Sequence, residues 1–188
     1  EALAPRLPER LPELAARMAL IHDLARRNVE AGSGGPFAAG VFERDGGRIV
    51  ALGVNRVVPL GLSSAHAEVM ALSLAQQALG RWDLGAPELP PHQLVVNWRP
   101  CAMCFGATLW SGVVELAIAG DGPELEELTG FDEGPLPADW RSELARRRIA
   151  LTVGVGRDEA LSVFRAFAAS GSLVYNGRGG GRCAADPL

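Results

Sequence analysis

The sequence predicts an α/β protein, a three-layer α/β/α sandwich built on a mixed sheet of roughly five strands. Strand-like and helix-like apolar segments alternate along most of the chain, which is typical of helices covering both faces of a sheet. Asp45-Gly46-Gly47 separates two early strand segments and is a strong hairpin signal, so one edge of the sheet should be antiparallel. We expect the 188 residues to form a single domain over 1–188.

The first half of the chain should contain two helices and the hairpin. Residues 1–12 hold three prolines and read as an irregular lead-in. Apolar residues recur at helical spacing over Leu14–Glu30, and the Gly- and Pro-rich run 32–36 ends that helix. Ser64 is a suitable N-cap for the second helix. The remaining boundaries are strands at 37–43 and 48–57 and a helix from 64 to about 79.

In the second half, Gly and Pro mark the boundaries between elements. Gly80–Pro91 reads as a loop. Pro100 is expected to open a helix to about Ser111, because the missing N–H of proline is not needed at the first helical position. Residues 176–188 should form a flexible tail. The other expected elements are strands at 92–97, 113–119 and 149–155 and helices at 123–128, 137–148 and 158–170.

Composition narrows the class of protein. The chain is 48% hydrophobic and 21% charged, which is typical of a globular protein with one core. A net charge of -4 argues against a nucleic-acid binder that depends on bulk positive charge. No apolar run approaches the ~18–20 residues of a membrane span, and we expect no secretory signal. Three cysteines, two of them in a C-x-x-C, favour a reduced cytoplasmic protein over a disulfide framework.

The C-x-x-C and one histidine indicate a metal site. Cys101 and Cys104 lie three residues apart at the start of a predicted helix, so they share a face where thiolates are favoured. His66 lies at the start of another predicted helix. Two thiolates and an imidazole suit Zn²⁺, and three protein ligands leave one coordination position open, which is typical of catalytic zinc.

Glu68 is a candidate proton carrier beside this metal site. A carboxylate two residues after His66 can border the same pocket and move protons during hydrolysis. Taken alone, H-x-E is a common pattern and C-x-x-C is often redox-active. Together, H-x-E followed by P-C-x-x-C is the signature of zinc deaminases, and the chain has both, at 66–68 and 100–104.

With these motifs the chain resembles the cytidine deaminase superfamily, and most of all its bacterial guanine deaminase branch. The similarity extends from about residue 14 to 178 and rests on Gly34-Gly35-Pro36-Phe37, Asn55, Ala65–Glu68, Pro100–Cys104 and Gly130-Phe131-Asp132-Glu133. The last of these is the more specific pointer to purines. The resemblance implies a cytidine deaminase-like fold, one Zn²⁺ per subunit, a cytoplasmic homodimer and hydrolysis of guanine to xanthine and ammonia in purine catabolism.

The resemblance also implies roles for individual residues. His66, Cys101 and Cys104 would hold the zinc, Glu68 would be the main proton shuttle, and Glu133 would assist proton transfer to the leaving ammonia. The alternative for Glu133 is a solvated charge in an acidic loop.

Other residues would bind the base. Asn55 would hydrogen-bond a ring edge, Phe37 would stack or pack near the base, and the backbone N–H of Ala67 would be available to a substrate oxygen. The alternatives are that Asn55 only forms a turn and that Phe37 belongs to the core. Tyr175 and Asn176 either close over the pocket, as tails do in this branch, or belong to a frayed end.

The chain departs from the family in front of the C-x-x-C. Relatives usually have a small polar residue and a glutamate before the proline, whereas this chain has Asn97-Trp98-Arg99. Trp98 and Arg99 are therefore candidate substrate-binding residues, in a pocket reshaped for another amino-heterocycle, such as one with an acidic group for Arg99. The alternative is that Arg99 points to solvent and pairs with a carboxylate.

Three rival functions remain open. One is deamination of cytosine, an aminated triazine or a modified purine. A second is tRNA adenosine deamination, supported only by Arg146-Arg147-Arg148. A third is a non-catalytic zinc module, with Cys183 as a fourth ligand. For the leading interpretation, guanine deamination, we expect a small-molecule amino-heterocycle as substrate and no nucleic-acid or membrane partner.

Overall fold

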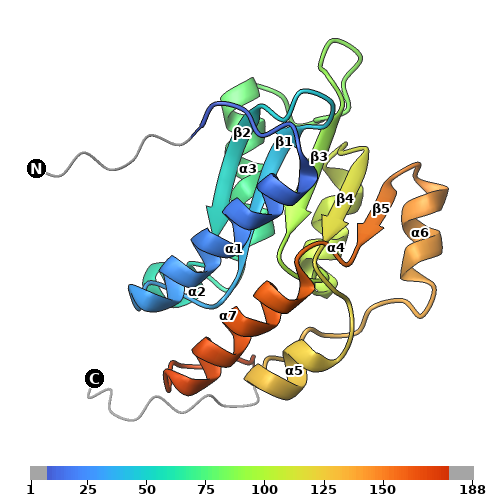
Figure 1. Cartoon of the computed structure of the whole chain (residues 1–188). Helices are drawn as coiled ribbons and strands as arrows, with labels where there is room; N and C mark the ends of the chain where they lie inside the picture. The colour runs from blue at the N-terminus through green and yellow to red at the C-terminus, as the bar shows by residue number, and fades with distance from the viewer. Residues whose placement is uncertain (1–7, 178–188) are drawn as a thin grey trace, which may run out of the picture.

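A computed structural model describes residues 8–177 of the chain. Its five-stranded sheet has the order β2-β1-β3-β4-β5, shown in Figure 1. β1 pairs antiparallel with both β2 and β3, whereas β3, β4 and β5 are parallel. The predicted mixed sheet with a leading hairpin is therefore confirmed. The strands are β1 Ala38–Glu43, β2 Ile49–Val54, β3 His92–Val96, β4 Glu115–Ile118 and β5 Ala150–Val153.

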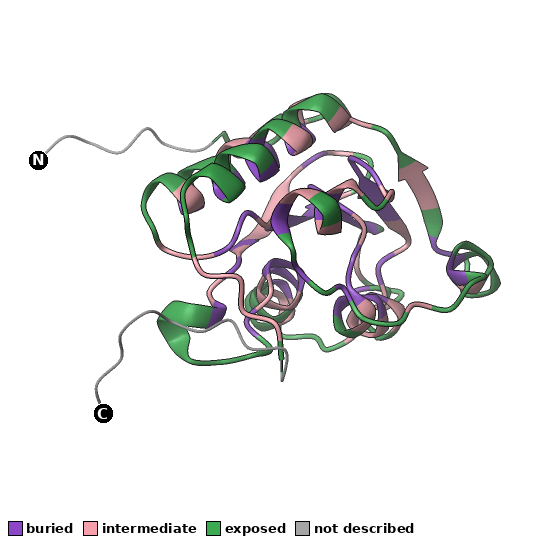
Figure 2. Ribbon diagram, turned by 90° about the horizontal axis from the view of Figure 1, so that it is seen from below, coloured by how far each residue is buried: buried purple, intermediate pink, exposed green. Residues whose placement is uncertain are grey.

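The helices cover both faces of this sheet, as the three-layer prediction requires. α1 and α7 lie against one face and α3 and α4 against the other (Figure 1). Seen along the sheet in Figure 2, the outer sides of the helices are exposed and the buried residues gather between the layers. The helices are α1 Leu14–Glu30, α2 Val57–Leu60, α3 Ala67–Leu79, α4 Ala102–Trp110, α5 Glu124–Thr129, α6 Trp140–Arg146 and α7 Arg157–Ala169.

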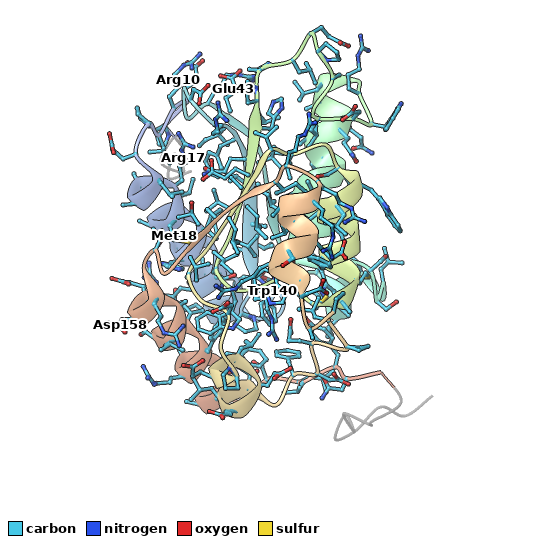
Figure 3. The ribbon with its side chains drawn as sticks, turned by 90° about the vertical axis from the view of Figure 1, so that its right-hand side faces the viewer. Arg10, Arg17, Met18, Glu43, Trp140 and Asp158 are labelled. Carbon is cyan, nitrogen blue, oxygen red and sulfur yellow. The ribbon has the colours of Figure 1, made fainter. Side chains whose placement is uncertain are left out.

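Alternation along the central strand separates two hydrophobic cores. Leu94 and Val96 of β3 pack with α3 and α4, while Val95 between them packs with α1 and α7. Met18 of α1 belongs to the second core and Trp140 of α6 to the first; both are labelled in Figure 3. A strand buried on both faces explains the uninterrupted apolar run Leu94-Val95-Val96 in β3.

Three predicted boundaries were wrong near the helix starts. α3 begins at Ala67 with His66 as N-cap, not at Ser64. α4 begins at Ala102 with Cys101 as N-cap, because Cys101 has extended backbone angles (φ -66°, ψ 173°); Pro100 therefore precedes the cap rather than opening the helix. The strand predicted over 48–57 ends at Val54, and Val57 begins the short helix α2 instead.

The ends of the described chain refine the predicted lead-in and tail. Residues 8–12 are irregular apart from a single bridge between Arg10 and Arg48. Asn176, expected in the tail, is held by two hydrogen bonds, while 178–188 lie outside the described residues. In the described range no helix combines the length and apolar character needed to cross a membrane.

The topology gathers the predicted site residues at one end of the sheet. The carboxyl ends of β2 and β3 and the start of β1 lie at the same end, since β1 is antiparallel to both neighbours. Asn55 follows β2, Phe37 precedes β1, and 97–101 follow β3. The β1–β2 turn and the start of β3 lie at the opposite end, where Arg44 donates its backbone N–H to Pro91 O at 2.8 Å.

Candidate metal centre and active site

His66 and Cys101 occupy equivalent positions at the starts of two neighbouring helices. His66 is the N-cap of α3 and Cys101 the N-cap of α4. Neither cap uses its side chain to hydrogen-bond its own helix, so both side chains are free to turn toward each other. The first amide groups of both helices are present here, and these groups favour negative charge such as a thiolate.

These two residues and Cys104 form a convergent set of metal donors. Their ligand atoms all lie within 4.8 Å of one another, and Cys101 Sγ is 3.5 Å from His66 Nδ1. Both cysteines are buried and neither forms a disulfide. Two sulfurs and one imidazole nitrogen, converging from three side chains, fit the donor chemistry and number of a catalytic Zn²⁺ site.

The pKa values of the Cys101 and Cys104 thiols are shifted in opposite directions. The hydrogen bonds from Cys104 and His66 outweigh burial and lower the pKa of Cys101 to about 4. The hydrogen bond to Cys101, together with burial, raises the pKa of Cys104. Cys101 is thus a thiolate that accepts a hydrogen bond from the Cys104 thiol, and binding of a dication releases the remaining proton.

Two buried carboxyl groups accompany the donor set. Burial, followed by the charge of Cys101, raises the pKa of Glu68 to about 7. Burial, then the charges of Cys101 and Glu68, raises the pKa of Glu133 to about 8. Only 6% of Glu68 and 8% of Glu133 is exposed, which excludes the solvated-charge reading of Glu133. Carboxyl groups that retain a proton near neutral pH suit proton transfer.

A small cavity brings these groups together and opens toward a larger one. About 10 Å³ is enclosed by Phe37, His66, Glu68, Val96, Trp98, Arg99, Cys101 and Glu133, which is about the space of one water molecule. A second cavity of about 560 Å³ shares Phe37, His66 and Glu133 with it. A cavity of that size is in the range that holds small organic ligands.

Asn55 is held rigidly in the loop after β2. It is fully buried, and its Oδ1 accepts the backbone N–H groups of Gly35 and Val57, both at 3.3 Å. Its Nδ2 is buried and has no partner within the described chain. Gly34 is required here, because a Cβ at that position would lie 1.9 Å from Asn55 O. The loop thus fixes the carboxamide with its donor side unused.

Phe37 lies between the core and the cavity. Its ring contacts Phe131 at 5.2 Å and Phe164 at 6.0 Å between centroids, and it lines both cavities. Phe37 therefore packs against the core and also lines the cavities, and its contact with a base stays a prediction. Ala67, whose N–H was predicted to reach a substrate oxygen, is fully buried in the first turn of α3.

The segment ending at Gly177 lies against the site. The Tyr175 ring is 4.9 Å from Phe131 and 6.4 Å from His66, between centroids, and its buried hydroxyl has no partner in residues 8–177. Asn176 accepts the N–H of Asp132 at 3.0 Å and donates to Gly130 O at 2.8 Å. Of the two sequence readings, the structure has the one in which these residues cover the pocket.

The three residues before Pro100 have different surroundings. Asn97 is fully buried and bridges the start of β1, accepting from Ala38 N and donating to Pro36 O. Trp98 is 1% exposed, donates to Gly122 O and packs edge-on against Phe164, so most of its indole belongs to the core.

Arg99 points neither fully to solvent nor to a carboxylate. Its Nη1 lies 3.4 Å from Asp121 O. Among the described residues Arg99 forms no ion pair, and the carboxylate of Asp121 pairs with Arg141 instead. Its Nε is buried without a partner, and its positive charge opposes the rise in the pKa of Glu133. The solvent-pairing alternative is therefore wrong, and substrate contact stays a prediction.

Sequence reasoning missed part of the pocket wall. Val57 and Val58 line the larger cavity from α2, which the sequence analysis had placed partly inside a strand. Val96, which lines the smaller cavity, was predicted only as part of the strand at 92–97. The signal for α2 was weak, because Val-Val-Pro-Leu favours extended backbone by propensity, and the tertiary context decides the helix.

The family model for the cytidine and deoxycytidylate deaminase zinc-binding region matches residues 12–119. This range contains His66, Glu68 and both site cysteines and covers more than half of the chain. The chain belongs to this family. The resemblance to this family that was inferred from the motifs is confirmed. The three convergent donors lie within the matched zinc-binding region.

The similar proteins include guanine deaminases and also a tRNA-specific adenosine deaminase of Agrobacterium fabrum (strain C58 / ATCC 33970), which is 32% identical over 78 residues, covering 42% of this chain and 48% of that protein. The guanine deaminase of Bacillus subtilis (strain 168) is 37% identical over 110 residues, which cover 58% of this chain and 65% of that protein. The chain thus spans slightly less than two thirds of this relative's length. A structure of NE0047 in complex with 2,6-diaminopurine is similar at 47% identity and a TM-score of 0.85, covering 91% of this chain and 89% of that one.

A further solved structure, of guanine deaminase from Nitrosomonas europaea, has 46% identity and a TM-score of 0.84 and covers 89% of this chain and 94% of that one. Because this likeness extends over almost the whole described fold, the cytidine deaminase-like architecture is confirmed.

Proposed function

We propose that the protein is a zinc-dependent aminohydrolase that converts guanine to xanthine and ammonia. One observation carries the proposal: two buried carboxyl groups, Glu68 and Glu133, share a small cavity with His66 and Cys101 of the convergent metal donors. His66 and Glu133 also line a larger cavity of about 560 Å³. The similarity to guanine deaminases supports guanine over other bases. A complex of NE0047 with 8-azaguanine supports a purine-sized ligand.

His66, Cys101 and Cys104 would hold the zinc, whose bound form supplies Lewis acidity that lowers the pKa of a water toward about 7. Glu68 accepts a proton from the attacking water and delivers it to the ring nitrogen beside the carbon that carries the amino group. Its pKa of about 7 suits both halves of this transfer.

Glu133 would act on the leaving group. Because its pKa is raised to about 8, it is mostly protonated at neutral pH and can donate to the amino nitrogen as ammonia leaves. Two carboxyl groups with separate positions allow one to serve the ring and the other the leaving nitrogen. Ammonia would leave as a neutral molecule, and the proton of the oxygen that becomes the new carbonyl would return to the Glu133 carboxylate, so the overall reaction takes up no proton.

The base would be held by three groups around the cavity. The free Nδ2 of Asn55 donates to a ring acceptor, Phe37 contacts the ring, and the N–H of Ala67 donates to the substrate oxygen. Arg99, which replaces the glutamate usual in the family, places positive charge beside Glu133. Trp98 supports the loop that carries Arg99.

The deciding experiment is a substrate panel. Zinc-loaded protein is incubated with guanine, 2,6-diaminopurine, cytosine, an aminated triazine and adenosine-containing tRNA, and ammonia release is measured. We expect guanine to give the highest kcat/KM. Turnover of another heterocycle with guanine inert would overturn the substrate, and absence of turnover with zinc bound would favour a non-catalytic module.

Assembly and location remain predictions of this proposal. We expect a cytoplasmic homodimer whose partner is a small molecule rather than nucleic acid or membrane. In the described chain, Arg146 and Arg147 are paired with Glu143, and Arg146 also with Asp139, which weakens the only sequence feature that favoured tRNA. The absence of salt-sensitive tRNA binding would agree with this, because electrostatic binding to nucleic acid weakens as salt rises.

A further inference from the structure

A groove of about 540 Å³ lies between α1 and α7, which pack side by side on one face of the sheet (Figure 1). None of its lining residues lines either cavity of the candidate active site. Small side chains leave this space open, and they are Ala15 and Ala19 of α1 and Ser162 and Ala166 of α7. A space of this size is in the range that holds small organic ligands.

His22 of α1 forms part of the wall of this groove and is only 5% exposed. Its Nε2 is buried and has no partner within residues 8–177, whereas buried polar atoms are normally hydrogen-bonded. Burial lowers the pKa of His22, although the charge of Glu159 opposes this, so the imidazole is neutral at neutral pH. In the tautomer with its proton on Nδ1, Nε2 is an acceptor that lacks a donor.

Gly156, the N-cap of α7, makes room for this imidazole. A Cβ at Gly156 would lie 2.6 Å from His22 Cε1 and 3.2 Å from His22 Nδ1. The same point lies 3.5 Å from Glu159 Oε2. The imidazole and the carboxylate therefore approach one place on the groove wall, where both can accept hydrogen bonds.

Glu159 is the charge in the groove wall that lacks a counter-ion. The other two charged residues of the wall, Asp23 and Arg26, pair with each other. Arg157, two residues before Glu159, pairs with Glu124, and within residues 8–177 Glu159 takes part in no ion pair. The two acidic residues in the first turn of α7 also outweigh the roughly half positive charge of the helix dipole. This end of the groove is therefore negative.

We propose that the groove between α1 and α7 binds a small organic amine, a positively charged ammonium group on an apolar body. An ammonium group has N–H donors and no acceptor, which suits the two acceptors that His22 and Glu159 place together. The apolar body would rest against Met18, which is labelled in Figure 3, and Val163. An anionic ligand would be repelled by Glu159, and an uncharged one would leave that charge without a partner.

An NMR chemical-shift titration at neutral pH tests this site, with benzylamine as the cationic probe and benzyl alcohol as its uncharged counterpart. The variants are Glu159→Gln, His22→Leu and, as a matched control, Asp158→Asn, an exposed position of the same turn outside the groove. We expect benzylamine to bind the wild type and D158N equally and to bind E159Q and H22L about tenfold more weakly or worse. Ala19→Phe, which fills the groove from an exposed position of α1, should also lose binding and replaces H22L if that variant does not fold.

Three results would overturn the amine site: no shifts with benzylamine in the wild type, equal affinities in the wild type and E159Q, or benzyl alcohol binding as tightly as benzylamine. Ammonia release from guanine is assayed on the same samples. Since no residue of the groove lines the catalytic cavities, a protein that binds benzylamine but leaves guanine unchanged would contradict the proposed reaction and leave the amine site standing.

Discussion

His66 Nδ1 lies 3.5 Å from Cys101 Sγ, and each residue is the N-cap of its helix. Two metal donors therefore come from the same structural position of two neighbouring helices. The backbone is still extended at both caps, which lets the side chains converge while the following residues enter the helices. Glu68, two residues after one cap, then lies in the first turn and faces the same cavity.

Replacing Glu68 with Gln should abolish turnover without removing the metal. The amide cannot carry a proton between water and the ring, and we expect kcat to fall by about 10²–10⁴-fold. Ammonia release and zinc content by elemental analysis check this. Glu88→Gln, an exposed loop position, is the control, and near-normal activity of E68Q would remove the mechanism.

Replacing Cys104 with Ser should release the zinc, whereas Cys183→Ser should retain it. Cys104 is one of the convergent donors among the described residues, whereas Cys183 lies outside the described residues. Zinc loss should lower the melting temperature, since a ligand at 1,000 times its Kd stabilises by about 4 kcal/mol. If C183S lost zinc as C104S does, the site would be a closed structural one.

The metal site could be predicted from the sequence because short-range spacing determines it. H-x-E and C-x-x-C fix two donor groups on two helix starts, and in the structure the ligand atoms of His66, Cys101 and Cys104 lie within 4.8 Å of one another. The positions of Tyr175 and Asn176 could not be chosen from sequence, because they depend on contacts with Phe131, Asp132 and Gly130, more than forty residues away.

The alkaline side of the pH–rate profile should report Glu133. Burial raises the pKa of Glu133 from its ordinary value of 4.5 to about 8, so the proton-donating form is present below pH 8 and is lost as pH rises through that value. In Glu133→Gln the rate should be lower and the fall near pH 8 absent. Glu127→Gln, an exposed position, should keep the wild-type profile, and an unchanged fall in E133Q would contradict the assignment.

Tyr175→Phe should separate substrate binding from stability. The Tyr175 hydroxyl is buried and without a partner in the described chain, so its removal should change the free energy of unfolding by less than about 0.5 kcal/mol. If the hydroxyl bonds the base, kcat/KM should fall by about tenfold. Asn55→Ala should instead lower both, because Asn55 also holds the Gly35 and Val57 amides.

Gly120→Ala should destabilise the fold beside Arg99. A Cβ at Gly120 would lie 2.5 Å from the Trp98 ring, and Arg99 donates its N–H to Gly120 O. We expect a loss of about 1–3 kcal/mol in urea unfolding. In the Trp98→Phe background the smaller ring should reduce this loss, and additive effects in the double mutant would show that the two residues are not coupled.

The position of Trp98 could be predicted from the sequence, but the direction of its indole ring could not. Its position before the C-x-x-C placed it correctly at the cavity wall. Nothing local indicated that the indole would turn into the core against Phe164 and beneath Arg157. Element types other than that of α2 were predictable, because periodicity is local, while the ends of α3, α4 and β2 depended on backbone angles at single residues.

Because β1 is antiparallel to both of its neighbours, the candidate site lies at one end of the sheet and the β1–β2 turn lies at the other. The turn after β1 and the loop that ends at Pro91 sit a full strand length away from Asn55, His66 and Cys101. Loop tips of this kind accept added chain readily. A fluorescent reporter or an affinity tag inserted at Gly46 should leave catalysis untouched, which makes that tip the natural place to attach a probe or tether the enzyme to a surface.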